Sequence, residues 1–158
     1  MFPTQKILTT SDELFAKKGF ENVSMQDISK ASKISIGSIY HAFKNGKEEI
    51  AITLLKNYAL DLQTRFGELL NQSILDEDLE KIFISIITIL LELGQKYPSS
   101  FQLSSFIQTK ELQELNQKIE MEICSKITFL LRLKIPEMNT QQAELETPIS
   151  KLNNLLKN

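Results

Sequence analysis

The sequence predicts an all-α protein. Apolar residues recur at spacings of three and four through nearly every segment, which is the period of one helix face. No run of residues alternates strictly between apolar and polar, as a half-buried strand would. Turn formers are few, with 5 Gly and 4 Pro in 158 residues, and the single Asn45-Gly46 pair lies between two helical patterns.

The first helix is expected from Thr4 to Lys18. Four apolar residues and one serine fall on one face at spacings of three, four and seven: Ile7, Leu8, Ser11, Leu14 and Phe15. Lys17 and Lys18 favour the negative end of the helix dipole, and Gly19 suits the left-handed position that follows a helix. The spacing therefore predicts a helix of about four turns that ends in a sharp turn.

Two short helices should follow. Ser24 is a candidate N-cap for a helix over residues 25–32, and Ser35 for one over residues 36–43. Ile39 and Phe43 are four residues apart and are expected to face the core. Two short helices across a short turn, braced by a longer first helix, form a helix-turn-helix unit.

The rest of the chain is expected to form further helices. Their predicted ranges are 47–71, 76–97, 101–109, 111–134 and 140–156, the last interrupted by Pro148. The most apolar stretch, residues 82–91, is far shorter than the roughly 20 residues that cross a bilayer, so we expect a buried helix and no membrane partner.

Charge is unevenly distributed along the chain. The net charge is −2, but residues 1–60 hold 8 Lys against 6 acids, which leaves 10 bases against 14 acids in the remainder. A mildly basic N-terminal part permits contact with nucleic acid through that part. The single cysteine, Cys124, and the absence of a signal-peptide pattern at residues 1–6 predict a cytoplasmic protein.

The residues give little support to catalysis. One histidine and one cysteine lie far apart, no Gly-rich phosphate loop is present, and the acidic residues have no matched spacing for a metal. The sequence therefore predicts no enzyme, no cofactor and no metal site.

The N-terminal third carries a series of residues in a particular order and spacing. These are Ile7, Leu8, Leu14, Phe15, Ala16, Gly19 and Phe20, then 24–28, 34–43 and 47–50. Over about residues 4–56 the series resembles the N-terminal signature of the tetracycline-repressor (TetR) family. The resemblance implies a three-helix DNA-binding head with a helix-turn-helix (1–46) and a helical-bundle body for ligand binding and dimerisation (47–158).

The resemblance also implies which residues meet DNA. The candidates are Ser24, Gln26, Lys33, Ser35, Ile36, Gly37, Ser38, Tyr40, His41 and Lys47. Ser24, Tyr40 and Lys47 would contact phosphates, which position a protein on DNA, while base contacts specify the sequence. With no arginine in the head and Ile36 available for a thymine methyl, we expect A·T-rich half-sites.

Four positions depart from the family pattern. Lys33 stands where a turn glycine is usual, and Ile36 where many relatives carry a polar base reader. Ala42 replaces a common aromatic residue, and Gly46 lengthens the link to the next helix by one residue. These departures bear on the docking angle on DNA and on which residues read the bases, but not on the fold.

The implied partners are a double-stranded, palindromic DNA operator, a second copy of the chain and a small apolar or aromatic effector. Aromatic candidates for the effector pocket are Phe83, Tyr97, Phe101 and Phe106, and a dimer face is expected from the 111–134 stripe with Leu145, Ile149, Leu152 and Leu156. The implied function is a repressor released from its operator by the effector. The alternative is a helical interaction protein that kept the fold but lost DNA binding.

Overall fold

A computed structural model describes residues 3–76, 78–106 and 109–134. This part of the chain contains seven α-helices and no strand, as the sequence predicts. They are α1 (Pro3–Lys18), α2 (Met25–Ser32), α3 (Ile36–Ala42), α4 (Lys47–Asp76), α5 (Leu79–Lys96), α6 (Ser100–Phe106) and α7 (Lys110–Lys134). The sequence placed the end of α4 five residues early, and the expected helix over 140–156 lies outside the described residues.

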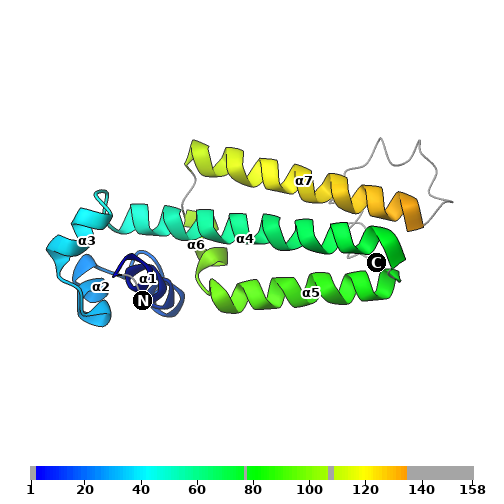
Figure 1. The fold of residues 1–158 in the computed structure, drawn as a ribbon. Helices are drawn as coiled ribbons and strands as arrows, with labels where there is room; N and C mark the ends of the chain where they lie inside the picture. Colours follow the sequence, from blue (N-terminus) through cyan, green and yellow to red (C-terminus); the bar gives the residue numbers. More distant parts are fainter. Residues whose placement is uncertain (1–2, 77, 107–108, 135–158) are drawn as a thin grey trace.

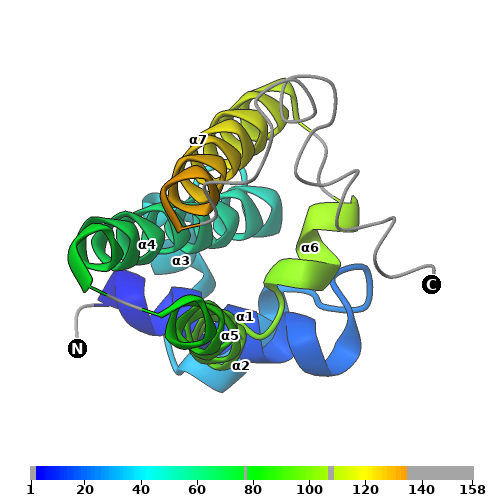
Figure 2. The ribbon, with the colours of Figure 1, turned by 90° about the vertical axis from the view of Figure 1, so that its right-hand side faces the viewer.

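The helices form a head and an elongated body that share α4. Figure 1 shows α1, α2 and α3 gathered around the start of α4, while the rest of α4 runs between α5 and α7. Figure 2, which looks along α4, likewise places α5 and α7 on opposite sides of it, with α6 to one side. The body is therefore organised around one long helix.

The head is held by an apolar core that draws on most of these elements. Phe15 of α1, Ile28 of α2, Ile39 of α3 and Ile50 of α4 are all fully buried in it. Leu103 of α6 belongs to the same cluster. The core of the head thus continues past residue 46 into the body helices, so the two parts are packed against each other.

Helix α5 differs from the buried helix expected over residues 82–91. Ile82 and Leu93 face α4 and are buried, but five large apolar side chains on the other face are 46–63% exposed: Phe83, Ile84, Ile87, Leu90 and Leu91. Among the described elements α5 packs mainly against α4, which covers only one of its faces. No helix in the described ranges is both long and apolar enough to span a membrane.

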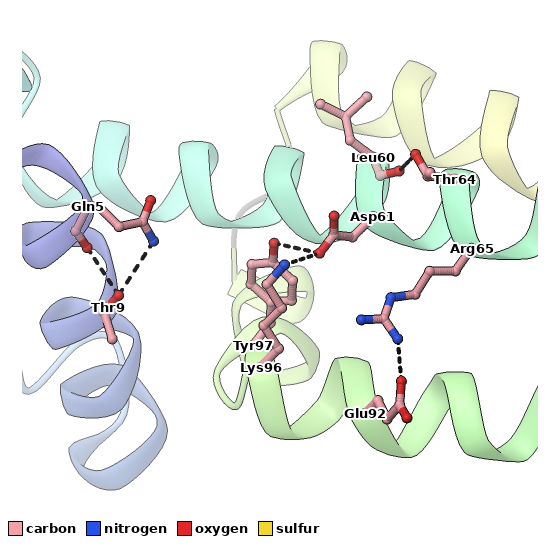
Figure 3. Close-up of polar contacts among 9 residues, drawn as sticks. All are labelled: Gln5, Thr9, Leu60, Asp61, Thr64, Arg65, Glu92, Lys96 and Tyr97. Atoms are coloured by element: carbon pink, nitrogen blue, oxygen red, sulfur yellow. Dashed lines mark hydrogen bonds and ion pairs between the residues drawn. The ribbon is translucent and has the colours of Figure 1, made fainter. Parts of the chain in front are cut away.

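Polar contacts fix the long helices of the body to one another. On one side of α4, Arg65 pairs with Glu92 of α5, and Asp61 binds Lys96 and Tyr97 at the end of α5 (Figure 3). On the other side, Gln63 donates to Glu122 of α7 at 2.6 Å. Such pairs are partly exposed and contribute modestly to stability, but they define the register between helices.

We expect Ile39→Ala to lower the free energy of unfolding by about 2–5 kcal/mol, because it leaves a cavity in the head core. The matched control is Ile36→Ala in the same helix, where the side chain is 38% exposed. That variant should cost less than about 1 kcal/mol. Urea unfolding followed by circular dichroism measures both, and equal losses would contradict the assignment of the buried and outward faces of α3.

Candidate nucleic-acid interface

The start of α2 is closed by a reciprocal cap. The Ser24 hydroxyl accepts from the Asp27 amide at 3.1 Å and donates to the Asp27 carboxylate at 2.6 Å, while the Ser24 amide donates to the same carboxylate at 2.9 Å. These bonds, with Lys18 at 3.6 Å, lower the pKa of Asp27 to about 2. Both polar groups of Ser24 are therefore already engaged within the chain.

The turn between α2 and α3 holds a lysine in a conformation that favours glycine. Lys33 has φ 59° and ψ 32°, the left-handed region, and is the only non-glycine residue with positive φ in the described ranges. The Ser29 hydroxyl donates to the Ile34 carbonyl at 2.7 Å and braces the turn. The lysine side chain remains exposed, so the turn presents a cation beside α3.

Helix α3 separates a buried anchor from an outward face. Ser35 caps it by accepting from the Ser38 amide at 3.1 Å, and the two hydroxyls lie 2.7 Å apart. Ile39 is fully buried, which turns the other side of the short helix away from the core. The exposed residues include every expected contact on this helix: Ile36, Gly37, Ser38, Tyr40 and His41.

Two glycines shape this face in different ways. A Cβ on Gly37 would meet nothing within 4 Å, so packing inside the protein does not require glycine there. Gly46 has φ 65°, and a Cβ there would lie 3.3 Å from the Tyr40 ring. The lack of a side chain at Gly46 therefore leaves room for the ring of Tyr40, which is 45% exposed.

The ammonium of Lys47, which the sequence suggested as a phosphate contact, already has partners within the head. It donates to the Phe20 carbonyl at 2.9 Å and the Glu21 carbonyl at 3.4 Å, and lies 4.5 Å from the centre of the Phe20 ring. These contacts join the start of α4 to the link between α1 and α2. The Lys47 side chain thus stabilises the packing of α4 against the α1–α2 link, and it also places a positive charge near the surface of the head.

The three expected phosphate contacts come together in space. Ser24, Tyr40 and Lys47 line one open hollow of about 520 Å³, although 23 residues separate the first from the last. Glu21 and Glu48 line it as well, which reduces its positive character. The exposed Gln26 and Lys33 belong to α2 and its turn and are not among the lining residues.

The sequence reading overlooked Lys44, which is exposed in the link between α3 and α4. Its position in the sequence could have indicated this, because Lys44 directly follows Phe43, the buried apolar residue that caps the end of α3. No group of three or more His, Cys, Asp or Glu side chains in the described parts of the chain is placed to hold a metal ion.

Of the four aromatic candidates for an effector pocket, the two whose side chains are described, Phe83 and Tyr97, lie at opposite ends of α5. Phe83 is 55% exposed near the start of α5, whereas Tyr97 directly follows the end of that helix, about 21 Å further along the chain at the helical rise. Tyr97 stacks edge-on against Tyr58 of α4, with ring centres 5.9 Å apart. The side chains of Phe101 and Phe106 lie outside what the structure describes.

Comparison with known proteins finds relatives of the head. Residues 7–54 match the model of the family described as bacterial regulatory proteins, tetR family. Over 48 residues the chain is 46% identical to the uncharacterized HTH-type transcriptional regulator YxaF of Bacillus subtilis strain 168, and over 117 residues it is 33% identical to the regulator YuxN of the same strain. These matches cover 30% and 72% of the chain, but only 25% and 39% of the two relatives.

Solved structures share the fold over a greater length. The TetR-family regulator PfmR of Thermus thermophilus gives a TM-score of 0.70 at 20% identity, covering 94% of this chain and 79% of that one. A TetR-family regulator of Bordetella parapertussis 12822 gives 0.70 at 20%, covering 90% and 74%. The relatives are transcriptional regulators rather than enzymes.

The cap at α2 predicts an acid titration that can be observed directly. Because the pKa of Asp27 is lowered from 3.8 to about 2, its stabilising effect is present above pH 3.8 and is lost as pH falls towards 2. Ser24→Ala removes the hydroxyl donor and should raise the carboxyl midpoint towards 3.8 in an NMR titration. Ser35→Ala, the same change at the cap of α3, should leave that midpoint in place, and an unmoved midpoint in Ser24→Ala would refute the cap.

Proposed function

Because residues 7–54 identify this chain as a member of the TetR family of bacterial regulatory proteins, we propose that it is a transcriptional regulator that binds operator DNA through α3. The observation that carries the proposal is the division of α3 into a buried anchor at Ile39 and an opposite face whose residues are exposed. The match of residues 7–54 to the family model supports it. We further propose that the protein is a repressor that a small effector releases from its operator.

In this proposal α3 enters the major groove. Gly37 and Ser38 allow close approach to base edges, Ile36 contacts a thymine methyl, and His41 lies on the same exposed side. Tyr40 approaches the phosphate backbone at the edge of the groove. The A·T-rich half-site expected from the sequence is proposed on the same ground, since Ile36 is exposed and the head has no arginine.

Phosphate contacts are proposed from the hollow beside α3. Ser24 has its hydroxyl bound to Asp27, so the amides of the first turn of α2 are the better donors there. Gln26 of that turn, Lys33 and Ser35 complete the proposed surface. Lys47 contributes charge while its ammonium keeps its bonds to the Phe20 and Glu21 carbonyls.

One observation favours a second candidate function. The exposed apolar face of α5, from Phe83 to Leu91, is typical of a surface that other proteins contact. A helical interaction protein that kept the fold but lost DNA binding would bind its partner through such a face and would not bind DNA through α3. Measuring DNA binding against salt separates the two functions.

The protein should shift fragments that carry its own upstream region, with affinity falling linearly on a log–log plot against salt. Tyr40→Phe should weaken this binding about tenfold on every sequence, because it removes a hydroxyl proposed to meet phosphate. Tyr58→Phe in the body is the matched control and should bind as the parent does.

A change of sequence preference in Tyr40→Phe would contradict the phosphate role, and the absence of any salt-dependent binding would favour the interaction protein. Lys47→Ala should also weaken DNA binding, but this variant tests the phosphate role less cleanly than Tyr40→Phe. It should also lower stability, because it removes the hydrogen bond to the Phe20 carbonyl.

We propose that the chain dimerises, since a palindromic operator presents two half-sites related by a two-fold axis. Part of the α7 stripe packs on α4, where Ile119 is 4% exposed, while Met121 and Phe129 are 59% and 52% exposed. The expected partners at Leu145 to Leu156 lie outside the described residues.

Light scattering at micromolar concentration should therefore give twice the 18.1 kDa chain mass. Phe129→Glu on α7 should shift the mass towards the monomer, and the matched Phe83→Glu on α5 should leave it unchanged. A monomeric parent would contradict the dimer, and the reverse response of the two variants would place the contact on α5.

A further inference from the structure

A second hollow lies where the head meets the body. It has a volume of about 540 Å³ and is bounded by α1, by the middle of α4 and by the end of α5 with the residue that follows it. Sites for small molecules typically have volumes of about 300–1,000 Å³. We call it the junction hollow; of the two aromatic candidates whose side chains are described, Phe83 and Tyr97, it includes Tyr97.

A buried carboxylate faces the junction hollow without a cation. Asp12 of α1 is 3% exposed, and one of its oxygens accepts from the Ser99 amide at 3.0 Å and from the Ser99 hydroxyl. Within the described structure its other oxygen has no hydrogen bond and no ion pair. Burial raises the pKa of Asp12, since a carboxylate out of water without a counter-charge is costly.

The other charges of the hollow balance each other. Asp61 of α4 accepts from the Lys96 ammonium at 2.5 Å and from the Tyr97 hydroxyl at 2.9 Å (Figure 3). Among the described residues that line the hollow, Lys96 is the single cation, and these bonds hold it at Asp61. Two carboxylates against one lysine leave Asp12 as the uncompensated charge.

The remaining walls combine apolar surface with neutral polar groups. Leu8, Leu54 and Leu60 line the hollow, and Leu60 is 54% exposed, which is high for a leucine in the middle of a helix. Asn57 also lines it, and its side-chain amide makes no hydrogen bond to the residues that the structure describes. Such a mixture suits a molecule with one charged end and a short apolar body.

We propose that the junction hollow binds a small organic cation, a protonated amine with a short apolar or aromatic body, whose ammonium pairs with Asp12. The body lies against the leucines of α1 and α4, and Asn57 supplies a further hydrogen bond. An ammonium at Asp12 restores the counter-charge that the protein itself does not provide.

The site also bears on the contact between head and body. Asp12 belongs to α1 of the head, and Ser99 directly precedes α6, whose Leu103 packs into the head core. A cation at Asp12 therefore acts on the polar bond that joins the two parts. Any effect on operator binding rests on the proposed function, whereas binding of the amine does not.

The test uses 2-phenylethylamine and its neutral counterpart 2-phenylethanol with the full chain in titration calorimetry. The amine should bind at least about tenfold more tightly than the alcohol, as expected for a charge-assisted hydrogen bond. Asp12→Asn keeps the side-chain shape and an acceptor for Ser99, and should abolish this preference. Glu13→Gln removes the same charge from the exposed side of α1 and should preserve it.

A second pair of variants keeps the test valid if Asp12→Asn fails to fold. Leu60 is exposed, so Leu60→Lys should be tolerated, and its ammonium should weaken amine binding at least about tenfold by repulsion and by occupying Asp12. Leu60→Gln is the neutral control and should retain the preference for the amine. Equal binding of amine and alcohol to the parent, or no binding of either at millimolar concentration, would overturn the proposal.

A gel shift with and without the amine separates the two proposals. If the amine binds through Asp12 but no DNA is bound, the junction site stands and the proposed function fails. If DNA is bound and the amine is not, the proposed function stands and the junction site fails.

Discussion

The structure depends on the continuity of helix α4, which runs unbroken over 30 residues, about 45 Å at the helical rise. Its first turns give Ile50 and Leu54 to the head core, and its later turns bury Phe66 and Leu70 in the body. One rigid element is therefore part of both cores. The head and the body are therefore joined by a continuous helix rather than by a loop.

The head uses its polar groups first to stabilise itself. Ser24 closes the cap with Asp27, Ser35 caps α3, and Lys47 holds the carbonyls that follow α1. What remains free on α3 is mostly small or apolar, with Tyr40 and His41 at its end. The hollow that Ser24, Tyr40 and Lys47 line is also lined by Glu21 and Glu48, so this part of the head surface has little positive character.

The junction between head and body is built from two kinds of contact. Leu103 gives non-directional burial in the head core, whereas Asp12 and Ser99 form a directional polar bond in a buried setting. Asp61 ties the end of α5 to α4 nearby. The turn between α5 and α6 is thus attached to α4 on one side and to α1 on the other.

The sequence by itself determined what depends on near neighbours in the chain. Helix ranges, the caps at Ser24 and Ser35 and the buried position of Ile39 follow from spacings of three and four, so they were predicted closely. Tertiary structure alone decided the rest. Asp12 is buried against Ser99, which lies 87 residues away in the sequence, so no local pattern could predict the contact. Helix α5 keeps an exposed apolar face because, among the described helices, chiefly α4 packs on it. Ser24, Tyr40 and Lys47 share one hollow because the head core folds α2, α3 and α4 together, which no local pattern specifies.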